Sequence, residues 1–434
     1  MGGGANGTHY ICAGGLHTPS SRAKREIVVD DEPTFITRVA IENYKSIARC
    51  DVSLGSLTYL VGRNGAGKSN FLDALRFVAD ALRIGLDAAV RSRGSVDDLR
   101  YRDAEPGATI GLRFDLSLPA GTRGHYTLRL AQGQRGGFAI AEERCTVEYP
   151  AGGQPATGFH IRDGQLLEGL NGLRVVPTDR LYLATAPLPY ERSVYDVLAN
   201  MAFYQPVAAQ MRIPRAHEAG ELMLPDGSNV ASVVLRLAEQ QPEVLVRITE
   251  DLHAVLPTLQ LVRAVRVGGY DALEFYQQRG DFDPLQFYRG SGAVTLERQF
   301  SAVVMSDGTL HALGVLVALF QGGFGAERRP AVIGIEEPET SLHPGAATVL
   351  GDAFMDVAEL SQVLVTTQSA ELLDNKEVRP ESILAVEFAG GATRIGPLGA
   401  GQAAVIREHL ATAGELLRTS GFRPALAVAG HHTS

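Results

Sequence analysis

The sequence contains no tryptophan, and it has only three cysteines and four lysines among its 434 residues. The cysteines, at positions 12, 50 and 145, are far apart, and none lies in a Cys-x-x-Cys or Cys/His pattern. A disulfide framework and a zinc site are therefore not expected, and the chain fits a reducing cytoplasm. The longest apolar run, residues 310–320, is shorter than the roughly 20 residues of a membrane-spanning helix, so we expect no membrane partner.

Positive charge is also in short supply, because 40 basic residues face 49 acidic ones and the net charge is −9. This balance excludes a uniformly basic nucleic-acid-binding protein and leaves room for a local basic patch. Arg91, Arg93, Arg100 and Arg102 follow one another closely, but aspartates lie among them. A solvated face is therefore favoured over contact with a nucleic-acid backbone, although DNA stays open as a partner.

The first 33 residues lack the hydrophobic segment of a signal peptide, and we expect a disordered leader there. The apolar run 57–62 then predicts a buried strand, and residues 69–86 have apolar side chains at helical spacing. Further helices are expected at 230–240, 242–256, 306–321 and 346–360, and further strands at 34–47, 108–118, 126–131, 272–277, 331–339 and 362–369. Strands that alternate with helices indicate a largely parallel sheet.

Between the strand 57–62 and the helix 69–86 lies the octet GRNGAGKS, residues 62–69, which matches G-x-x-x-x-G-K-[ST]. Its glycines let the backbone curl so that successive N–H groups point at phosphate oxygens, and the helix N-terminus favours the same negative charge. Lys68 is expected to reach the β- and γ-phosphates of a nucleotide, and Ser69 to hold Mg²⁺. A chance match in a glycine-rich turn is the alternative, and the position between strand and helix argues against it.

The strand at 331–339 brings two adjacent carboxylates to its C-terminal end. We expect Glu336 to contact Mg²⁺ or its water shell, and Glu337 to polarise an attacking water. A third element, Ser306-Asp307-Gly308-Thr309, opens a helix and can offer N–H and hydroxyl groups to an anion. Taken alone, this third element is typical of an ordinary helix cap.

In their order along the chain, these motifs resemble those of the ABC-type ATPases of the SMC, RecF and OLD group, and in particular its compact bacterial AAA-family members. The segments that carry the resemblance are NYKSI (43–47), NGAGKSNFLDALRFVADAL (64–82), IEEPETSLHP (335–344) and the TTQS strand end (366–369). The resemblance implies an α/β fold, an ABC-type P-loop ATPase head with a mostly parallel sheet, an antiparallel β lobe and an inserted α/β region. The expected parts are a leader (1–33), the two halves of the head (34–131 and 300–400), the insertion (132–299), and a C-terminal helix and tail (401–434).

The resemblance also implies which residues bind the cofactors, ATP and Mg²⁺. Ser306 and Gly308 would form the signature motif, which in such ATPases touches the γ-phosphate of the opposite protomer. Residues 341–343 would form the D-loop at the dimer seam, and Gln368 would stand at the switch position. The remaining phosphate- and metal-binding positions are Gly62, Arg63, Asn64, Gly65, Ala66, Gly67, Lys68, Ser69, Asn70 and Glu336.

ATP would then join two heads into a homodimer, with higher oligomers left open, and hydrolysis aided by Glu337 would release them. Two departures from the family pattern point to slow hydrolysis. The switch residue is Gln368 where the family usually has histidine, and glutamine carries no proton at neutral pH. No glutamine occurs between Lys68 and Gln132 to serve as a Q-loop, although Asp97 or Asp98 could substitute.

Several functions fit this pattern. The first is a nucleotide-gated ATPase that acts on DNA or on an effector in DNA repair or antiphage defence. The alternative is an ATP-binding scaffold or regulatory subunit for a nuclease or toxin, with little hydrolysis of its own. OLD nucleases carry a C-terminal Toprim domain, and the residues after Ser369 are too few and lack a D-x-D pair, so nuclease activity in this chain is not expected. A transporter ATPase is disfavoured, because residues 306–309 lack LSGGQ.

Overall fold

The computed structural model describes residues 35–133, 137–150, 155–169, 180–185, 189–277, 284–289, 298–323 and 329–425. The expected leader, residues 1–33, and the tail beyond residue 425 lie outside these ranges.

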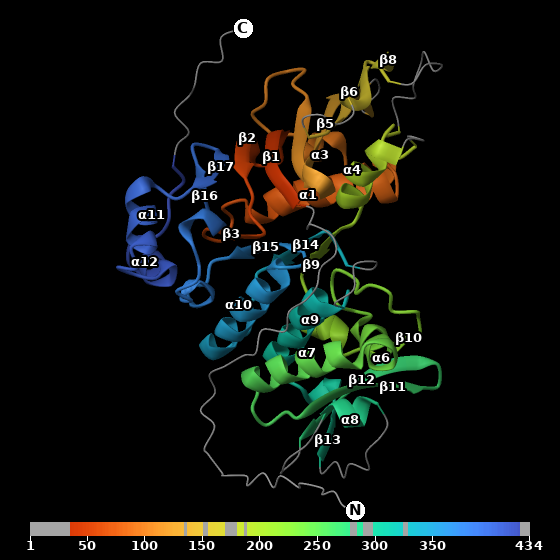
Figure 1. The fold of residues 1–434 in the computed structure, drawn as a ribbon, viewed down its shortest axis with the longest axis vertical. Coiled ribbons are helices and arrows are strands. Elements are labelled where there is room, and N and C mark those ends of the chain that lie inside the picture. The colour runs from red at the N-terminus through yellow and green to blue at the C-terminus, as the bar shows by residue number, and fades with distance from the viewer. Residues whose placement is uncertain are drawn as a thin grey trace, which may run out of the picture. The chain divides into compact units, whose positions relative to one another are not determined.

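A six-stranded sheet places β3, from the first part of the chain, between strands from its last part (Figure 1). Its strand order is β17-β16-β3-β15-β14-β9. The strands are β3 (Leu57–Val61), β9 (Met201–Tyr204), β14 (Val332–Glu336), β15 (Gln362–Thr367), β16 (Ile383–Ala389) and β17 (Ala392–Pro397). All neighbours run parallel except β17, which forms an antiparallel hairpin with β16. Because parallel strands end at the same edge, the segments after β3, β14 and β15 lie close together.

The two faces of this sheet belong to two hydrophobic cores. Leu60, Leu364 and Leu384 face the core that contains α1 (Lys68–Arg83). Val61, Ile335 and Val365 face the core that contains α9 (Asp307–Phe320) and α10 (Pro344–Ala358). Covering on both faces explains why β14 and β15 are buried along their whole length and show no alternation of buried and exposed residues.

The core around α1 also includes one face of a seven-stranded antiparallel sheet, which is the β lobe expected of an ABC-type head. Its order is β2-β1-β4-β5-β6-β7-β8. The strands are β1 (Phe35–Tyr44), β2 (Ile47–Ser53), β4 (Ile110–Leu118), β5 (Thr122–Gln132), β6 (Phe138–Glu148), β7 (Thr157–Arg162) and β8 (Gln165–Glu168). The helix α4 (Pro189–Ala199) packs on this sheet, and the short helices α2 (Leu86–Arg91) and α3 (Val96–Leu99) follow α1.

A third, smaller sheet has the order β10-β12-β11, with β13 paired to β12. Its strands are β10 (Arg215–Ala216), β11 (Leu261–Val267), β12 (Tyr270–Gln277) and β13 (Arg298–Ser301). The helices of this region are α5 (Ala208–Met211), α6 (Val230–Gln240), α7 (Pro242–Val255) and α8 (Pro284–Tyr288), and α11 (Ala400–Arg407) and α12 (Ala413–Ser420) come last. In the described part of the chain, no helix is both long enough and apolar enough to cross a bilayer.

Two features of the sheets bear on the expected insertion, 132–299. Residue 132 ends β5, which pairs with β6 along one continuous sheet. The strand β9, which lies inside the expected insertion, pairs with β14 of the six-stranded sheet. The division of the chain into head and insertion remains a prediction, and the structure shows that strands from 138 to 204 extend both sheets of the head.

Candidate functional site

The octet 62–69 forms the turn between β3 and α1. Gly65 and Gly67 have φ angles of 77° and 101°, and Gly67 is the N-cap residue of α1. The only backbone bond that closes the turn from within is the one from the Ala66 N–H to the Arg63 carbonyl, at 3.1 Å, among the described residues. In that part of the chain, no acceptor meets the backbone N–H groups of Asn64, Gly65, Gly67, Lys68 and Ser69. A ring of unpaired donors at a helix N-terminus is a site for a phosphate group.

Two glycines of the octet are needed because strands of the later hairpin pack so closely against them that a side chain would not fit. A Cβ at Gly67 would lie 2.0 Å from Oγ1 of Thr393, in β17, and a Cβ at Gly62 would lie 2.2 Å from the carbonyl oxygen of Val386, in β16. The Thr393 hydroxyl also donates to the Ala66 carbonyl at 2.9 Å. The shape of the turn therefore depends on a hairpin that lies more than 300 positions later in the chain, since Thr393 and Ala66 are 327 positions apart.

Lys68 places a buried ammonium group inside this turn. Its side chain is 4% exposed, and Nζ donates to the carbonyls of Gly62 at 2.8 Å and Arg63 at 3.3 Å. Nζ also lies 3.6 Å from Oε1 of Glu337. Two neutral carbonyls and one half-exposed carboxylate leave much of this buried charge available to an anion.

The two residues after Lys68 differ in their surroundings. Ser69 is exposed at the start of α1, where its hydroxyl is free to bind a ligand. Asn70, which the sequence places in the same binding set, donates from Nδ2 to the Ser46 hydroxyl at 2.6 Å. Asn70 therefore ties the helix to the turn between β1 and β2.

Glu336 and Glu337 stand at the C-terminal end of β14, as the sequence predicts. The backbone N–H of Glu337 donates to the Thr366 carbonyl at 3.0 Å, which continues the pairing with β15. Glu337 has a φ of 44°, an uncommon conformation for a residue with a side chain, and this strain is typical of functional sites. The Glu337 side chain is 31% exposed and faces Lys68, whereas Glu336 is buried and meets Arg76 of α1 at 3.0 Å.

Gln368 follows β15 at the expected switch position. Its side chain is exposed, and its backbone N–H donates to Oε1 of Glu339 at 2.9 Å. The Thr367 hydroxyl donates to the same oxygen at 2.8 Å, while Oε2 of Glu339 is buried without a partner in the described structure. Glu339 thus fixes the backbone of the switch position, a role that sequence reasoning missed although it is the third acid of IEEPE.

Ser306 and Gly308 lie at the start of α9, and they contact the expected D-loop. The Ser306 side chain accepts from the backbone N–H of Thr309 at 3.1 Å, and Ser306 itself is exposed. A Cβ at Gly308 would lie 2.4 Å from the carbonyl oxygen of Ser341, which has a φ of 63°. Within the described part of the chain, no hydrogen bond joins Ser306 or Gly308 to residues 62–69.

His311 links the same helix to the turn that carries Glu337. Its Nδ1 lies 3.0 Å from the Pro206 carbonyl oxygen, and Nε2 is buried without a partner in the described structure. Burial lowers the pKa of His311, and the backbone carbonyls of Pro206, Glu337 and Pro338 oppose this effect. His311 lies inside a helix of otherwise apolar pattern, and no sequence signal marked it.

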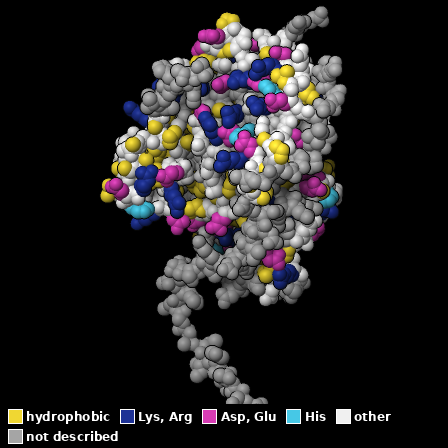
Figure 2. All heavy atoms as spheres, turned by 45° about the horizontal axis from the view of Figure 1, so that its top comes forward, with side chains coloured by type: hydrophobic (Ala, Val, Ile, Leu, Met, Phe, Trp, Pro, Cys, Tyr) yellow, Lys and Arg dark blue, Asp and Glu magenta, His cyan; other side chains and the backbone are white. Residues whose placement is uncertain are grey.

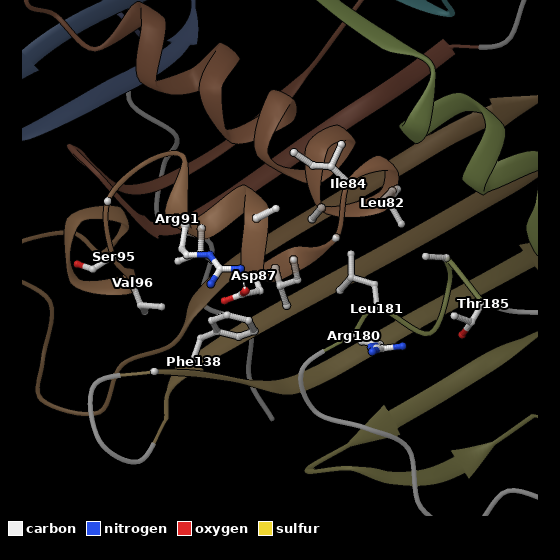
Figure 3. Close-up of a pocket in the computed structure, with 18 residues that line it drawn as sticks. Leu82, Ile84, Asp87, Arg91, Ser95, Val96, Phe138, Arg180, Leu181 and Thr185 are labelled. Carbon is white, nitrogen blue, oxygen red and sulfur yellow. Dashed lines mark ion pairs between the residues drawn. The ribbon is translucent and has the colours of Figure 1, made fainter.

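In the described structure, one cavity lies beside the D-loop and a second lies apart from the turn 62–69. One of about 170 Å³ is lined by residues of the D-loop and the segment after Gln368: Glu339, Leu342, His343, Pro344, Ala347, Ser369 and Glu371. A larger cavity of about 710 Å³ lies at the C-terminal end of α1 and includes Leu82, Phe138 and Leu181 (Figure 3). Since α1 has 16 residues, that end is roughly 20 Å from Lys68, and the larger cavity is separate from the turn 62–69.

The hydrogen-bond donors of the turn and the oxygen ligands beside it fit a nucleotide with Mg²⁺. Among the described residues, no three His, Cys, Asp or Glu side chains are close enough to form a complete metal site. Mg²⁺ is commonly bound by one or two protein oxygens together with phosphate oxygens and water. Ser69 and Glu336 are the protein oxygens that could serve here, beside the unpaired N–H groups and Lys68.

The arginine cluster after α1 is largely neutralised. Arg93 is buried and pairs with Asp73 and Asp80, each at 2.9 Å, and Arg91 pairs with Asp87. Basic and acidic side chains are interspersed on the face of the molecule shown in Figure 2. Asp97 and Asp98, considered as Q-loop substitutes, lie in α3, where Asp98 completes a capping box with Ser95.

Two protein-family models match this chain. One, described as "AAA ATPase domain", matches residues 35–127. The other, described as "AAA domain" with the words "AbiEii toxin, Type IV TA system", matches residues 233–374. The first contains the octet 62–69, and the second contains Ser306, Glu337 and Gln368, so the matches fall on both halves of the site.

Similarity to individual proteins is more distant. The OLD nuclease of Thermus scotoductus is 25% identical over 352 residues, which cover 78% of this chain and 60% of that nuclease. A crystal structure of an SMC head bound to the C-winged helix domain of ScpA is 14% identical, with a TM-score of 0.47, and the match covers 85% of this chain and 99% of that one. The SMC head domain from Thermotoga maritima is 12% identical, with a TM-score of 0.42, over 84% of this chain and 99% of that one.

Proposed function

We propose that this chain, an ABC-type P-loop ATPase of the SMC, RecF and OLD group, binds ATP and Mg²⁺ at residues 62–69 and hydrolyses ATP slowly. The observation that carries the proposal is the buried Lys68 ammonium, surrounded by unpaired backbone N–H groups and facing Glu337 at 3.6 Å. Buried positive charge and unpaired donors at one helix N-terminus are stabilised by a polyanion such as a triphosphate.

The residues of the site would have different roles in phosphate binding, metal binding and activation of water. The N–H groups of the turn and Lys68 hold the phosphates in place, and they stabilise the charge that develops during transfer. Ser69 and Glu336 would hold Mg²⁺, which would neutralise phosphate charge when bound. Glu337 would orient and polarise the attacking water, and its strained backbone aims the side chain at Lys68. Gln368, fixed through its backbone by Glu339, can donate a hydrogen bond to the γ-phosphate but cannot carry a proton.

We further propose that ATP joins two copies of this chain. Ser306 is exposed and makes no hydrogen bond to the turn of its own chain in the described structure, so it is available to a nucleotide held by a second copy. Gly308 packs directly on Ser341, which keeps the signature and the D-loop in register at one surface. Binding of ATP would then be coupled to assembly, and hydrolysis to separation.

Lys68→Ala and Glu337→Gln test this proposal. Lys68→Ala is expected to lose binding of a fluorescent ATP analogue by tenfold or more. Glu337→Gln should bind ATP and accumulate as a dimer measured by light scattering. Lys376→Ala is the matched control, because Lys376 is exposed and lies outside the site. Unchanged ATP binding in Lys68→Ala, or turnover at the parental rate in Glu337→Gln, would overturn the assignment.

A second candidate is a regulatory head for a nuclease or toxin, in antiphage defence or DNA repair. The similarity to an OLD nuclease, of which the match covers 60%, supports this candidate. In this role ATP binding would control the effector or its contact with DNA, and little hydrolysis would be required. The purified protein should show no cleavage of plasmid DNA by itself with ATP and Mg²⁺. Cleavage that survives in Lys68→Ala but requires this chain would contradict the regulatory role.

A further inference from the structure

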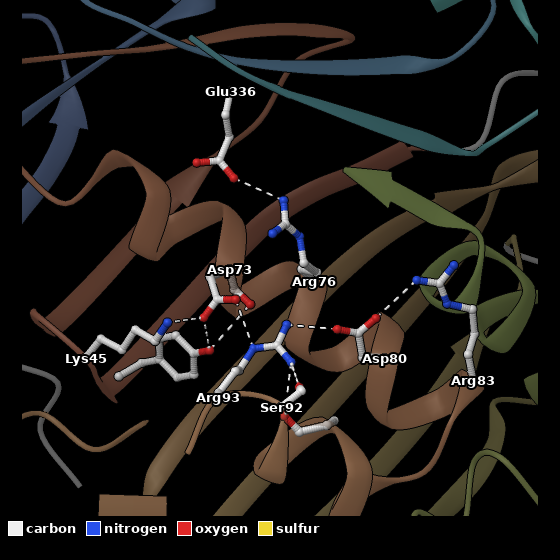
Figure 4. A network of polar contacts seen from close by, with 10 residues as sticks. Lys45, Asp73, Arg76, Asp80, Arg83, Ser92, Arg93 and Glu336 are labelled. Atoms are coloured by element: carbon white, nitrogen blue, oxygen red, sulfur yellow. Dashed lines mark hydrogen bonds and ion pairs between the residues drawn. The ribbon is translucent and has the colours of Figure 1, made fainter. Parts of the chain in front are cut away.

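We propose that Arg76 is a positioning residue that holds one oxygen of Glu336 so that the other oxygen faces Mg²⁺. This inference rests on the proposed function. Arg76 donates from Nη2 to Oε1 of Glu336 at 3.0 Å, across 260 positions of sequence. Figure 4 shows Arg76 extending from α1 toward Glu336 at the end of β14.

The contact is made at one oxygen only. Oε1 of Glu336 meets Arg76, and no hydrogen bond or ion pair is made by Oε2 within the described residues. The Glu336 side chain is 9% exposed, so little freedom remains for its carboxylate to turn once Oε1 is held. A single hydrogen bond to a metal-binding carboxylate fixes its orientation and leaves a lone pair for the ion or its water shell.

The helix places Arg76 where this role requires it. Ser69 and Arg76 are seven residues apart on α1, which is two helical turns, so both lie on one face of the helix. The same face thus carries the hydroxyl expected to bind Mg²⁺ and, roughly 10 Å further along, the guanidinium that reaches the expected second ligand.

Arg76 is held in turn by the six-stranded sheet. Its guanidinium lies over the ring of Phe203, in β9, at 5.4 Å from the centroid. Gly334 of β14 makes room for that ring, because a Cβ there would lie 2.3 Å from Cδ1 of Phe203. Nε of Arg76 is buried without a partner, so the stacking on Phe203 and the bond to Glu336 are the contacts that fix this side chain in the described structure.

The other charged residues of α1 have a different arrangement. Asp73 pairs with Lys45 and Arg93, and Asp80 pairs with Arg93 and Arg83 (Figure 4). These pairs join α1 to the segments beside it and do not include a residue of the expected metal site. Apart from Lys68, which faces Glu337, Arg76 is therefore the charged side chain of α1 whose ion pair, in the described structure, reaches the expected site.

Two competing effects decide what Arg76 does. A guanidinium beside the site repels Mg²⁺, whereas an oriented carboxylate binds it more tightly. Oε2 has no partner among the described residues, and the phosphates would add negative charge around the ion. The gain in Mg²⁺ affinity from an oriented Glu336 carboxylate should therefore exceed the loss from repulsion by Arg76. Loss of a partner that orients a metal ligand typically lowers metal affinity about 10- to 100-fold.

The test measures nucleotide binding with and without Mg²⁺ in Arg76→Ala and Arg76→Lys. In EDTA, both variants should bind a fluorescent, non-hydrolysable ATP analogue as the parent does. In a Mg²⁺ titration at fixed analogue, Arg76→Ala should need about tenfold or more Mg²⁺ to reach half of the full signal, and Arg76→Lys should recover part of that loss. Arg83→Ala is the control, since Arg83 lies on the same helix and its ion pair among the described residues is with Asp80.

The outcomes separate this inference from the proposed function. If the parent protein binds no nucleotide, the proposed function fails. If the parent shows a Mg²⁺ dependence that Arg76→Ala shares or improves, only the role of Arg76 is refuted. If Arg76→Ala does not fold, Phe203→Leu removes the stacking and should raise the Mg²⁺ requirement in the same direction. An equal loss of binding in EDTA would indicate a structural role and overturn the inference.

Discussion

Gly67→Ala should destabilise the protein through Thr393, and the structure gives the size of the effect. At a φ of 101°, a side chain at position 67 is strained by about 1–2 kcal/mol. The added Cβ would lie 2.0 Å from Oγ1 and 2.7 Å from Cγ2 of Thr393, so that residue must move. Overpacking of this kind adds about 1–3 kcal/mol, which gives a total of about 2–5 kcal/mol.

Thr393 cannot move freely, because its hydroxyl donates to the Ala66 carbonyl at 2.9 Å and lies 2.7 Å from the Ser46 hydroxyl. Thr393→Ala removes both of the nearest clashing atoms and leaves the strain at position 67. In that background, Gly67→Ala should therefore cost about 1–3 kcal/mol less than it does in the parent. The strain that remains would still weaken nucleotide binding.

Urea unfolding of the parent, both single variants and the double variant measures this coupling as a double-mutant cycle. Gly65→Ala is a useful comparison, since Gly65 has a φ of 77° and no atom lies within 4 Å of an added Cβ. Gly65→Ala should therefore lower the free energy of unfolding by the backbone strain alone, without a steric clash. Additive effects of Gly67→Ala and Thr393→Ala would refute the steric reasoning, as would equal losses for Gly65→Ala and Gly67→Ala.

Two further predictions concern protons. Burial raises the pKa of Glu143 from 4.5 to about 7, although the N–H donors of Leu183 and Tyr182 oppose this shift. Between these two pH values the unfolded state loses the proton that the folded state keeps. The free energy of unfolding should therefore fall by up to about 3 kcal/mol through this group as pH rises from 4.5 to 7. Chemical denaturation at several pH values should show a flatter dependence for Glu143→Gln than for the parent, and an identical slope would contradict the prediction. Gln368→His should raise the steady-state ATPase rate several-fold while leaving the affinity for ATP unchanged. Parental turnover in Gln368→His would mean that the switch residue does not limit hydrolysis.

Much of the fold could be predicted because the signals are local. The helix expected at 230–240 occupies those residues, and the strands expected near 57–62 and 362–369 lie within one or two residues of their observed bounds. The octet 62–69 needs only a strand, glycines and a helix in succession, and all of these are visible along the sequence. The two matched family models, described as an AAA domain and an AAA ATPase domain, fall on the same segments.

The parts that were missed depend on contacts far apart in the sequence. The strand β9 has four buried residues and no periodicity, so nothing in its pattern shows that it joins β14. Thr393 shapes the turn of Gly67 across the sheet, and Arg76 meets Glu336 from a helix that looks like an ordinary amphipathic one. The bond from the Asn70 amide to Ser46 is likewise invisible along the sequence, and the assignment of Asn70 to the ligand set stays a prediction. Side-chain direction at such positions is decided by tertiary packing.

The placement of β3 between β15 and β16 has a consequence for how the protein is made. β3 pairs with β15 (Gln362–Thr367) and β16 (Ile383–Ala389), so the six-stranded sheet cannot form until most of the chain has left the ribosome. At roughly 5–20 residues per second, this delay lasts on the order of tens of seconds. A nascent chain would expose the glycine-rich turn long before Thr393 and Glu337 arrive. If the turn binds ATP as proposed, products truncated before residue 330 lack Glu337 and Thr393 and should bind it more weakly than the full chain does.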